Sequence, residues 1–198
     1  MVPKPRAEMI EETRAKLLAT GRQHFGTAGF AATVMDDLTA RAGLTRGALY
    51  HHFGDKTGLF FAVVQDVDRE MERRLADVAA RASTSWQAFT GRCRAYLAMA
   101  LEPEIQRIVL RDAPSVLDEA RLEAIRQPCV TAVAGLLQGL MDKAVIAPAP
   151  TAPLARLING GLMDSALWIA RSSDSDQALA EALAGLEVLL AGLRLPGQ

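Results

Sequence analysis

A glycine corner between two short helical patterns constrains this chain more than any other feature, and it lies in the segment TVMDDLTARAGLTRGALYHHF, residues 33–53. Thr33 is predicted to N-cap the first helix of the pair. Gly43 follows that helix, at a position where the backbone commonly needs a positive φ. Thr45 is predicted to cap a second helix, Arg46 to Phe53. Two short helices joined in this way form a helix-turn-helix, whose second helix enters the DNA major groove.

A set of residues at fixed spacing near the N-terminus carries a resemblance to a known family. These residues are Gly43, Leu44, Thr45, Arg46, Gly47, Leu49, Tyr50, His52, Phe53, Lys56 and Leu59. Together they resemble the TetR family of transcriptional repressors, and the resemblance extends over about residues 8–61. Position 39 departs from the family, which prefers Ala where this chain has Thr. Because Thr is only slightly larger than Ala, we expect the substitution to be tolerated.

The start of the second helix is expected to read the DNA sequence. Arg46 is the best candidate for a base contact, because a guanidinium binds guanine O6 and N7 with two hydrogen bonds. Gly47 lets the backbone approach closely, and Thr45 can reach a base edge or a phosphate. Contacts that fix position on the backbone without reading sequence are expected from Thr33, Tyr50, His51, His52 and Lys56.

Several of these residues have a plainer interpretation. The ring of Tyr50 can pack in the core, and a structural role is compatible with a DNA contact. Adjacent histidines on a helix diverge by about 100°, so His51 and His52 are poorly placed to bind one metal ion together. Asp36 and Asp37 suit the positive end of the first helix, and the alternative is that one of them accepts from a cytosine amino group.

Composition favours an all-α fold of about nine helices, because Ala and Leu are abundant, aromatic residues make up 5% and no long segment alternates in the β manner. The net charge of −1 does not by itself indicate nucleic-acid binding. Residues 1–56 hold eight Lys/Arg and six Asp/Glu, against fourteen and seventeen in 57–198. This asymmetry points weakly to a helix-turn-helix DNA-binding domain at 1–56, where locally placed charges bind phosphate. The resemblance implies that residues 57–198 form a helical ligand-binding and dimerisation domain.

Apolar periodicity and capping residues set the expected boundaries of the other helices. Met1 to Arg6 is expected to be a disordered arm. Gly26 and Gly29 should end the first helix, Pro114 the sixth, and Pro128 should break or kink the seventh. The expected helices, besides the two of the motif, are 7–27, from about 56 to 81, 85–101, 103–114, 117–145, 154–171 and 176–193, with a stiff loop at 146–153.

The resemblance implies that the helices of the second domain enclose a ligand cavity and that residues 154–193 pair with a second copy in a homodimer. The candidate ligand contacts are Trp86, Phe89, Tyr96, Met99, Ile105, Val109, Met163 and Trp168. Each of them is as well explained by ordinary core packing, because aromatic and aliphatic residues at helical spacing are expected in any bundle. The function that follows is a repressor released from a palindromic operator by a small, largely apolar ligand.

No motif indicates an enzyme, a cofactor or a metal site. Cys93 and Cys129 are isolated and form no CxxC, so we expect two small apolar side chains in a reducing cytosol. No apolar run reaches the ~20 residues of a membrane span, so a soluble cytoplasmic protein is expected. The alternatives are a helical small-molecule-binding protein without DNA function, or a helical enzyme that uses a cavity carboxylate such as Asp112 or Asp164.

Overall fold

The computed structural model describes residues 5–195, and over this range the protein is all-helical apart from one isolated antiparallel bridge between Ile146 and Arg194. The expected arm at Met1 to Arg6 lies almost wholly outside the described residues. The helices are α1 (Arg6–Ala32), α2 (Met35–Ala42), α3 (Arg46–Phe53), α4 (Lys56–Ala80), α5 (Ser85–Met99), α6 (Pro103–Ile105), the π-helical segment η1 (Gln106–Asp112), α7 (Ala113–Val116), α8 (Glu119–Asp142), α9 (Thr151–Arg171) and α10 (Ser175–Ala191). Because α6, η1 and α7 follow one another without a break, they count as one segment, which gives the nine expected.

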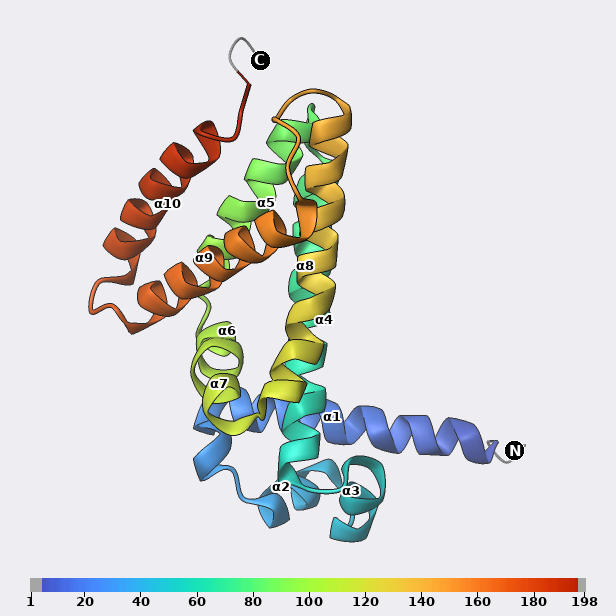
Figure 1. Cartoon of the computed structure of the whole chain (residues 1–198). Coiled ribbons are helices and arrows are strands. Elements are labelled where there is room, and N and C mark those ends of the chain that lie inside the picture. Colours follow the sequence, from blue (N-terminus) through green and yellow to red (C-terminus); the bar gives the residue numbers. More distant parts are fainter. Residues whose placement is uncertain (1–4, 196–198) are drawn as a thin grey trace.

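Helix α4 connects the two ends of the molecule. Figure 1 shows α1, α2 and α3 grouped around its first turns and α5 and α8 beside its later turns, with α9 packed on α8 and α10 outermost. Its apolar stripe is buried from Leu59 through Val63 and Val67 to Leu75, whereas Val78, the next residue at this spacing, is 37% exposed. The same helix therefore packs against the N-terminal helices at one end and against the later helices at the other. A displacement of α4 at one end is carried to the other end.

The core of the N-terminal head is an aromatic cluster between α1 and α4. Phe25 and Phe60 meet edge to face with ring centroids 5.0 Å apart, and Phe30 lies 5.1 Å from Phe60. Leu38 of α2 and Leu49 of α3 are fully buried against this head core. Val34, the N-cap residue that precedes α2, lies outside this core and is 53% exposed.

The end of α1 differs from the prediction. The helix continues through Gly26 and is interrupted only at Gly29, whose φ of 82° and ψ of 170° turn the chain before a last short stretch to Ala32. Thr33 does not cap α2, because its hydroxyl donates to the carbonyl of Gly29 at 2.7 Å and its residue is 4% exposed. Thr39 is buried, and its hydroxyl donates to the Met35 carbonyl at 3.0 Å.

Two prolines and one loop differ from the predictions. Pro114 lies in the first turn of α7, inside the continuous α6–η1–α7 segment, rather than at the end of a helix. Pro128 does not break α8, which packs along α4, α5 and α9 and continues to Asp142. The expected loop at 146–153 is shorter, because α9 already begins at Thr151.

Gly29→Ala is expected to lower the free energy of unfolding by about 1–3 kcal/mol, because the φ and ψ of Gly29 are in a region that is essentially closed to other residues. An added Cβ would also lie 3.2 Å from an oxygen of Asp112. Urea denaturation measures the change. Gly135→Ala in α8 is the matched control, because a Cβ there meets nothing within 4 Å, and it should stabilise by up to about 1 kcal/mol. Equal effects at the two positions would contradict this account.

Candidate nucleic-acid interface and interior cavity

The start of α3 is exposed and rigidly held. Gly43 has a left-handed backbone (φ 64°, ψ 33°), which sets the corner after α2, and a non-glycine residue would be strained there. The Thr45 hydroxyl accepts from the Ala48 backbone N–H at 3.2 Å, so the predicted N-cap is confirmed. Leu49 is 1% exposed and anchors the opposite side of the helix. The Gly43 corner and the buried Leu49 therefore fix the position of this helix end. The residues exposed there are Thr45, Arg46 and Gly47.

Arg46 is paired with Asp36 across the motif. The Arg46 Nε lies 3.0 Å from the Asp36 Oδ1, and the two side chains are 57% and 61% exposed. An exposed ion pair of this kind is worth only about 0–1 kcal/mol. Asp36 therefore positions the Arg46 guanidinium at the surface through an interaction weak enough to be exchanged for another.

The remaining predicted DNA residues divide into surface and interior positions. Tyr50 is 45% exposed and lies one turn after Arg46, so its ring is not a core residue. His51 is exposed and His52 half-buried, with ring centroids 5.4 Å apart. Among the described residues no group of three or more His, Cys, Asp or Glu is arranged to hold a metal ion. Thr33 is buried, so its side chain is not presented at this surface.

Lys56 begins α4 beside the end of α1. Its ammonium lies 4.5 Å from the centroid of the Phe30 ring and 3.4 Å from the Ala31 carbonyl oxygen, and burial lowers its pKa. Asp55 caps the helix by accepting from the Gly58 N–H at 2.6 Å. A cation at a helix N-terminus is electrostatically unfavourable, so the position of Lys56 is not explained by the stability of α4.

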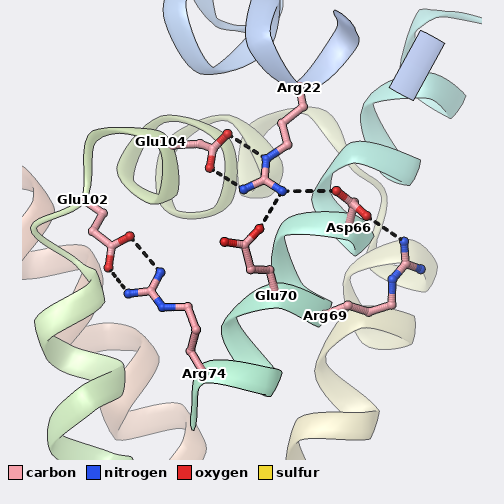
Figure 2. A network of polar contacts seen from close by, with 7 residues as sticks. All are labelled: Arg22, Asp66, Arg69, Glu70, Arg74, Glu102 and Glu104. Carbon is pink, nitrogen blue, oxygen red and sulfur yellow. Dashed lines mark hydrogen bonds and ion pairs between the residues drawn. The ribbon is translucent and has the colours of Figure 1, made fainter. Parts of the chain in front are cut away.

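An arginine on α1 is the main polar link between the head and the rest of the molecule. Figure 2 shows the Arg22 guanidinium between three carboxylates. It donates to both oxygens of Glu104 at 2.8 and 2.7 Å, to Glu70 at 2.8 Å and to Asp66 at 3.2 Å. Arg22 thereby joins α1 to α4 and α6. A second link is the Phe30 N–H, which donates to the Asp112 carboxylate of η1 at 2.7 Å.

The part of the molecule built from α4 to α10 contains an outer cleft and a smaller pocket that shares some of its lining residues. The outer cleft lies between α4 and α8, has a volume of about 620 Å³, and is bordered by Asp68, Arg73, Ala124, Pro128 and Cys129 among others. The smaller pocket of about 90 Å³, here called the inner cavity, shares Asp68 and Cys129 with it. The other residues around the inner cavity are mainly apolar and include Val64, Met71, Tyr96, Val109, Ile125 and Met163.

Three of the eight candidate ligand contacts border the inner cavity, namely Tyr96, Val109 and Met163. Phe89, Met99 and Ile105 are core residues, Trp168 is 47% exposed on α9, and Trp86 borders a different surface hollow beside Lys143. Sequence reasoning did not single out Asp68 or Asn159 as lining residues. The available signal was a polar residue at the edge of an apolar helical stripe, which is also common on ordinary surface helices.

Burial changes the acid–base behaviour of this region. It raises the pKa of the Asp68 carboxyl to about 6, with the nearby charge of Glu72 adding to the shift. It also raises the pKa of the thiol of Cys129 to about 12 and that of Cys93 to about 11. Both thiols are therefore protonated at neutral pH and poor nucleophiles.

Two family profiles match the chain. One, described as "Bacterial regulatory proteins, tetR family", matches residues 17–63, and the other, "Tetracyclin repressor-like, C-terminal domain", matches residues 86–193. The chain belongs to the TetR family. The members of this family are transcriptional regulators rather than enzymes, so the carboxylates considered for catalysis have another explanation. In this TetR-family chain Asp112 binds the end of α1, and Asp164 is exposed.

Relatives of known structure or curated function agree with this assignment. A crystal structure of a TetR-family transcriptional regulator from Pectobacterium atrosepticum is 50% identical, with a TM-score of 0.87 over 98% of this chain and 100% of that one. An HTH-type transcriptional repressor from Mycobacterium tuberculosis is 35% identical over 80 residues, and the transcriptional activator FasR from Mycolicibacterium smegmatis is 38% identical over 55 residues. These alignments span 40% and 28% of this chain and only 41% and 25% of those two proteins. Within residues 5–195, no helix combines the length and the apolar character needed to cross a bilayer.

Asp68→Asn is expected to raise the free energy of unfolding at pH 8 by about 1–3 kcal/mol. The folded chain holds the Asp68 proton up to about pH 6, whereas the unfolded chain releases it near the ordinary value of 3.8. The carboxylate therefore destabilises the fold as the pH rises through this interval, and its cost is constant above it. Denaturation at pH 8 and pH 4 should show a gain that is large at pH 8 and much smaller at pH 4. A gain of equal size at both would contradict the shifted pKa.

Proposed function

We propose that this chain is a homodimeric, sequence-specific DNA-binding transcriptional regulator, a repressor that a small, largely apolar ligand releases from an inverted-repeat operator. The observation that carries the proposal is the exposed Thr45–Arg46–Gly47 start of α3, held by the Gly43 corner and by buried Leu49. A small-molecule-binding protein without DNA function would have no use for that exposed helix end. The division into a DNA-binding domain at 1–56 and a ligand-binding and dimerisation domain at 57–198 is part of the proposal, and such a protein works in the cytoplasm, where the DNA is.

In this proposal Arg46 exchanges the carboxylate of Asp36 for a guanine. The exchange is cheap because the exposed ion pair is weak, whereas a bidentate contact to guanine discriminates against other bases by about 1–3 kcal/mol. Tyr50, His51, His52 and Lys56 bind the phosphate backbone and fix the register. The buried position of Thr33 favours a structural role in place of the predicted contact.

A dimer is supported by the apolar surface of α9 and α10. Leu157 is 75% exposed, Val188 76% and Leu189 57%, which is unusual for large apolar residues on adjacent helices. A Cβ added at Gly161 or Gly185 would meet nothing within 4 Å, so the backbones of partner helices have room to approach. A symmetric pair presents two α3 helices, which fit successive major grooves if they are about 34–36 Å apart.

The route from ligand to DNA is proposed to run through η1. The inner cavity touches Val109, Ala113 and Pro114 on either side of Asp112. Asp112 holds the Phe30 N–H, and Phe30 with Ala31 contacts Lys56. A ligand that prefers a different position of η1 and α4 thus changes the position of Lys56 and the spacing of the reading helices. A coupling of about 1–3 kcal/mol would weaken DNA binding roughly 5–150-fold, and DNA would weaken the ligand by the same factor.

The first experiment tests DNA binding by fluorescence anisotropy on palindromes from the DNA upstream of the gene. Affinity should fall steeply with salt. Arg46→Ala should reduce the preference for the operator over a scrambled duplex, whereas Lys56→Ala should weaken both alike. Arg171→Ala, which removes a positive charge from the end of α9, is the control and should change neither. No binding to any palindrome would remove the proposed function, and a reversed pattern would reverse the two roles.

The second experiment tests the dimer by light scattering after size-exclusion chromatography. The double change Leu157→Asp and Val188→Asp places charges on the proposed interface and should convert a dimer into a monomer with weaker operator binding. Val34→Asp is the control for oligomeric state, because Val34 is a comparably exposed apolar residue in the head. A wild-type chain that is monomeric at micromolar concentration, or a double variant that remains dimeric, would contradict the interface.

The third experiment tests the link between η1 and the head. Asp112→Ala removes the acceptor of the Phe30 N–H and should weaken operator binding several-fold without ligand, because the contacts of Lys56 lose their support. Ser115→Ala is the control, since that exposed hydroxyl bonds only within its own segment. The same anisotropy assay measures both. Unchanged operator affinity in a folded Asp112→Ala protein would show that this contact does not couple the two parts.

A further inference from the structure

Within residues 5–195, no arginine or lysine forms an ion pair with the Asp68 carboxylate, although the charges of Arg69 and Arg92 act on it from a distance. Its one hydrogen-bond neighbour in the described part of the chain is the Cys129 thiol, with Sγ 3.8 Å from Oδ1. The nearby arginines are engaged elsewhere, since Arg69 binds Asp66 at 3.2 Å and Arg92 binds Glu72 at 2.5 Å. A partly buried carboxylate is normally paired or hydrogen-bonded, so this one is an open acceptor.

The position of Asp68 gives this open acceptor a role. It borders both the outer cleft and the inner cavity, so a group bound to it from the cleft would have its remaining atoms against the cavity wall. That wall is mainly apolar. Arg126 also borders the inner cavity, but its guanidinium is bound to Glu123 at 2.8 Å and to Glu119 at 3.4 Å.

Pro128 removes a backbone donor from the part of α8 that borders the same cleft. Pro128 has no N–H, so it cannot donate to the carbonyl of Ala124, which precedes it by one helical turn. Both residues border the outer cleft next to Cys129. Within the described part of the chain, a helix position whose carbonyl lacks the usual N–H donor and a carboxylate with no arginine or lysine bonded to it thus border the same cleft.

We propose that the outer cleft binds a protonated organic amine, whose ammonium group lies on Asp68 and whose apolar body extends toward the inner cavity past Ile125. The proposal names the ligand class of the effector site and depends on the proposed function only for its regulatory consequence. An ammonium supplies up to three donors and the positive charge, whereas a neutral alcohol supplies one donor and a carboxylate supplies none. Arg69 and Arg73 at the mouth of the cleft make an anionic ligand the competing possibility.

The experiment uses the full chain without DNA and three probes of equal length at pH 8, namely 4-phenylbutylamine, 4-phenylbutanol and 4-phenylbutanoate. Isothermal titration calorimetry gives the affinities, and thermal unfolding gives the shift in Tm that a specific ligand causes by mass action. The amine should bind at least tenfold more tightly than the alcohol, and the butanoate should bind more weakly still. Homologues with two and six methylene groups set the best length.

Asp68→Asn should reduce the affinity for the amine at least tenfold and leave the alcohol nearly unaffected. Asp77→Asn is the matched control, because it makes the same change at an exposed position on α4 and should retain the amine. Equal binding of amine and alcohol, preference for the butanoate, retained amine binding in Asp68→Asn, or no binding of any amine in the series would each overturn the proposal. Operator binding is measured separately on the unmodified chain, so failure of DNA binding and failure of amine binding are distinguishable.

Discussion

The burial of the apolar stripe of α4 is the constraint on which the rest of the structure depends. Leu59 and Phe60 close the aromatic core of the head, and Met71 and Leu75 close the core of the body, so both cores use the same rigid rod. A helix packed at both ends does not bend to absorb a displacement, because its backbone hydrogen bonds and close-packed neighbours resist it. The two ends of the molecule are therefore mechanically connected before any ligand or DNA is considered.

Charged contacts determine how the head sits on that rod. Arg22 is surrounded by Glu104, Glu70 and Asp66 from two other helices (Figure 2), and it is partly shielded from solvent. Removing one partner of such a group is costly, because the remaining charges lose their compensation. The second contact involves one side chain only. The Asp112 carboxylate accepts from the Phe30 N–H and so holds the break in α1 at Gly29.

The local parts of the head were predictable from the sequence. The helix Arg46–Phe53, its Thr45 cap and the glycine corner at Gly43 are confirmed at the residues expected, because caps and positive-φ turns depend on a few neighbouring side chains. The errors occur where a distant residue decides. Thr33 is a residue type that commonly caps helices, but its hydroxyl donates to the Gly29 carbonyl instead. The turn at Gly29 is supported by Asp112, which is distant in the sequence. Likewise Pro128 continues a helix because three other helices hold it in place.

The sequence by itself determined the all-helical class, the helix-turn-helix and the membership of a regulator family, because periodicity, capping and spacing are properties of short segments. Only the tertiary structure decided which polar residues meet. Packing pairs Asp36 with Arg46 and Arg22 with its three carboxylates, and it leaves Asp68 with no ion-pair partner among the described residues. No pattern along the chain encodes such a pairing or its absence, because helix packing sets the distance between two side chains independently of their separation in sequence.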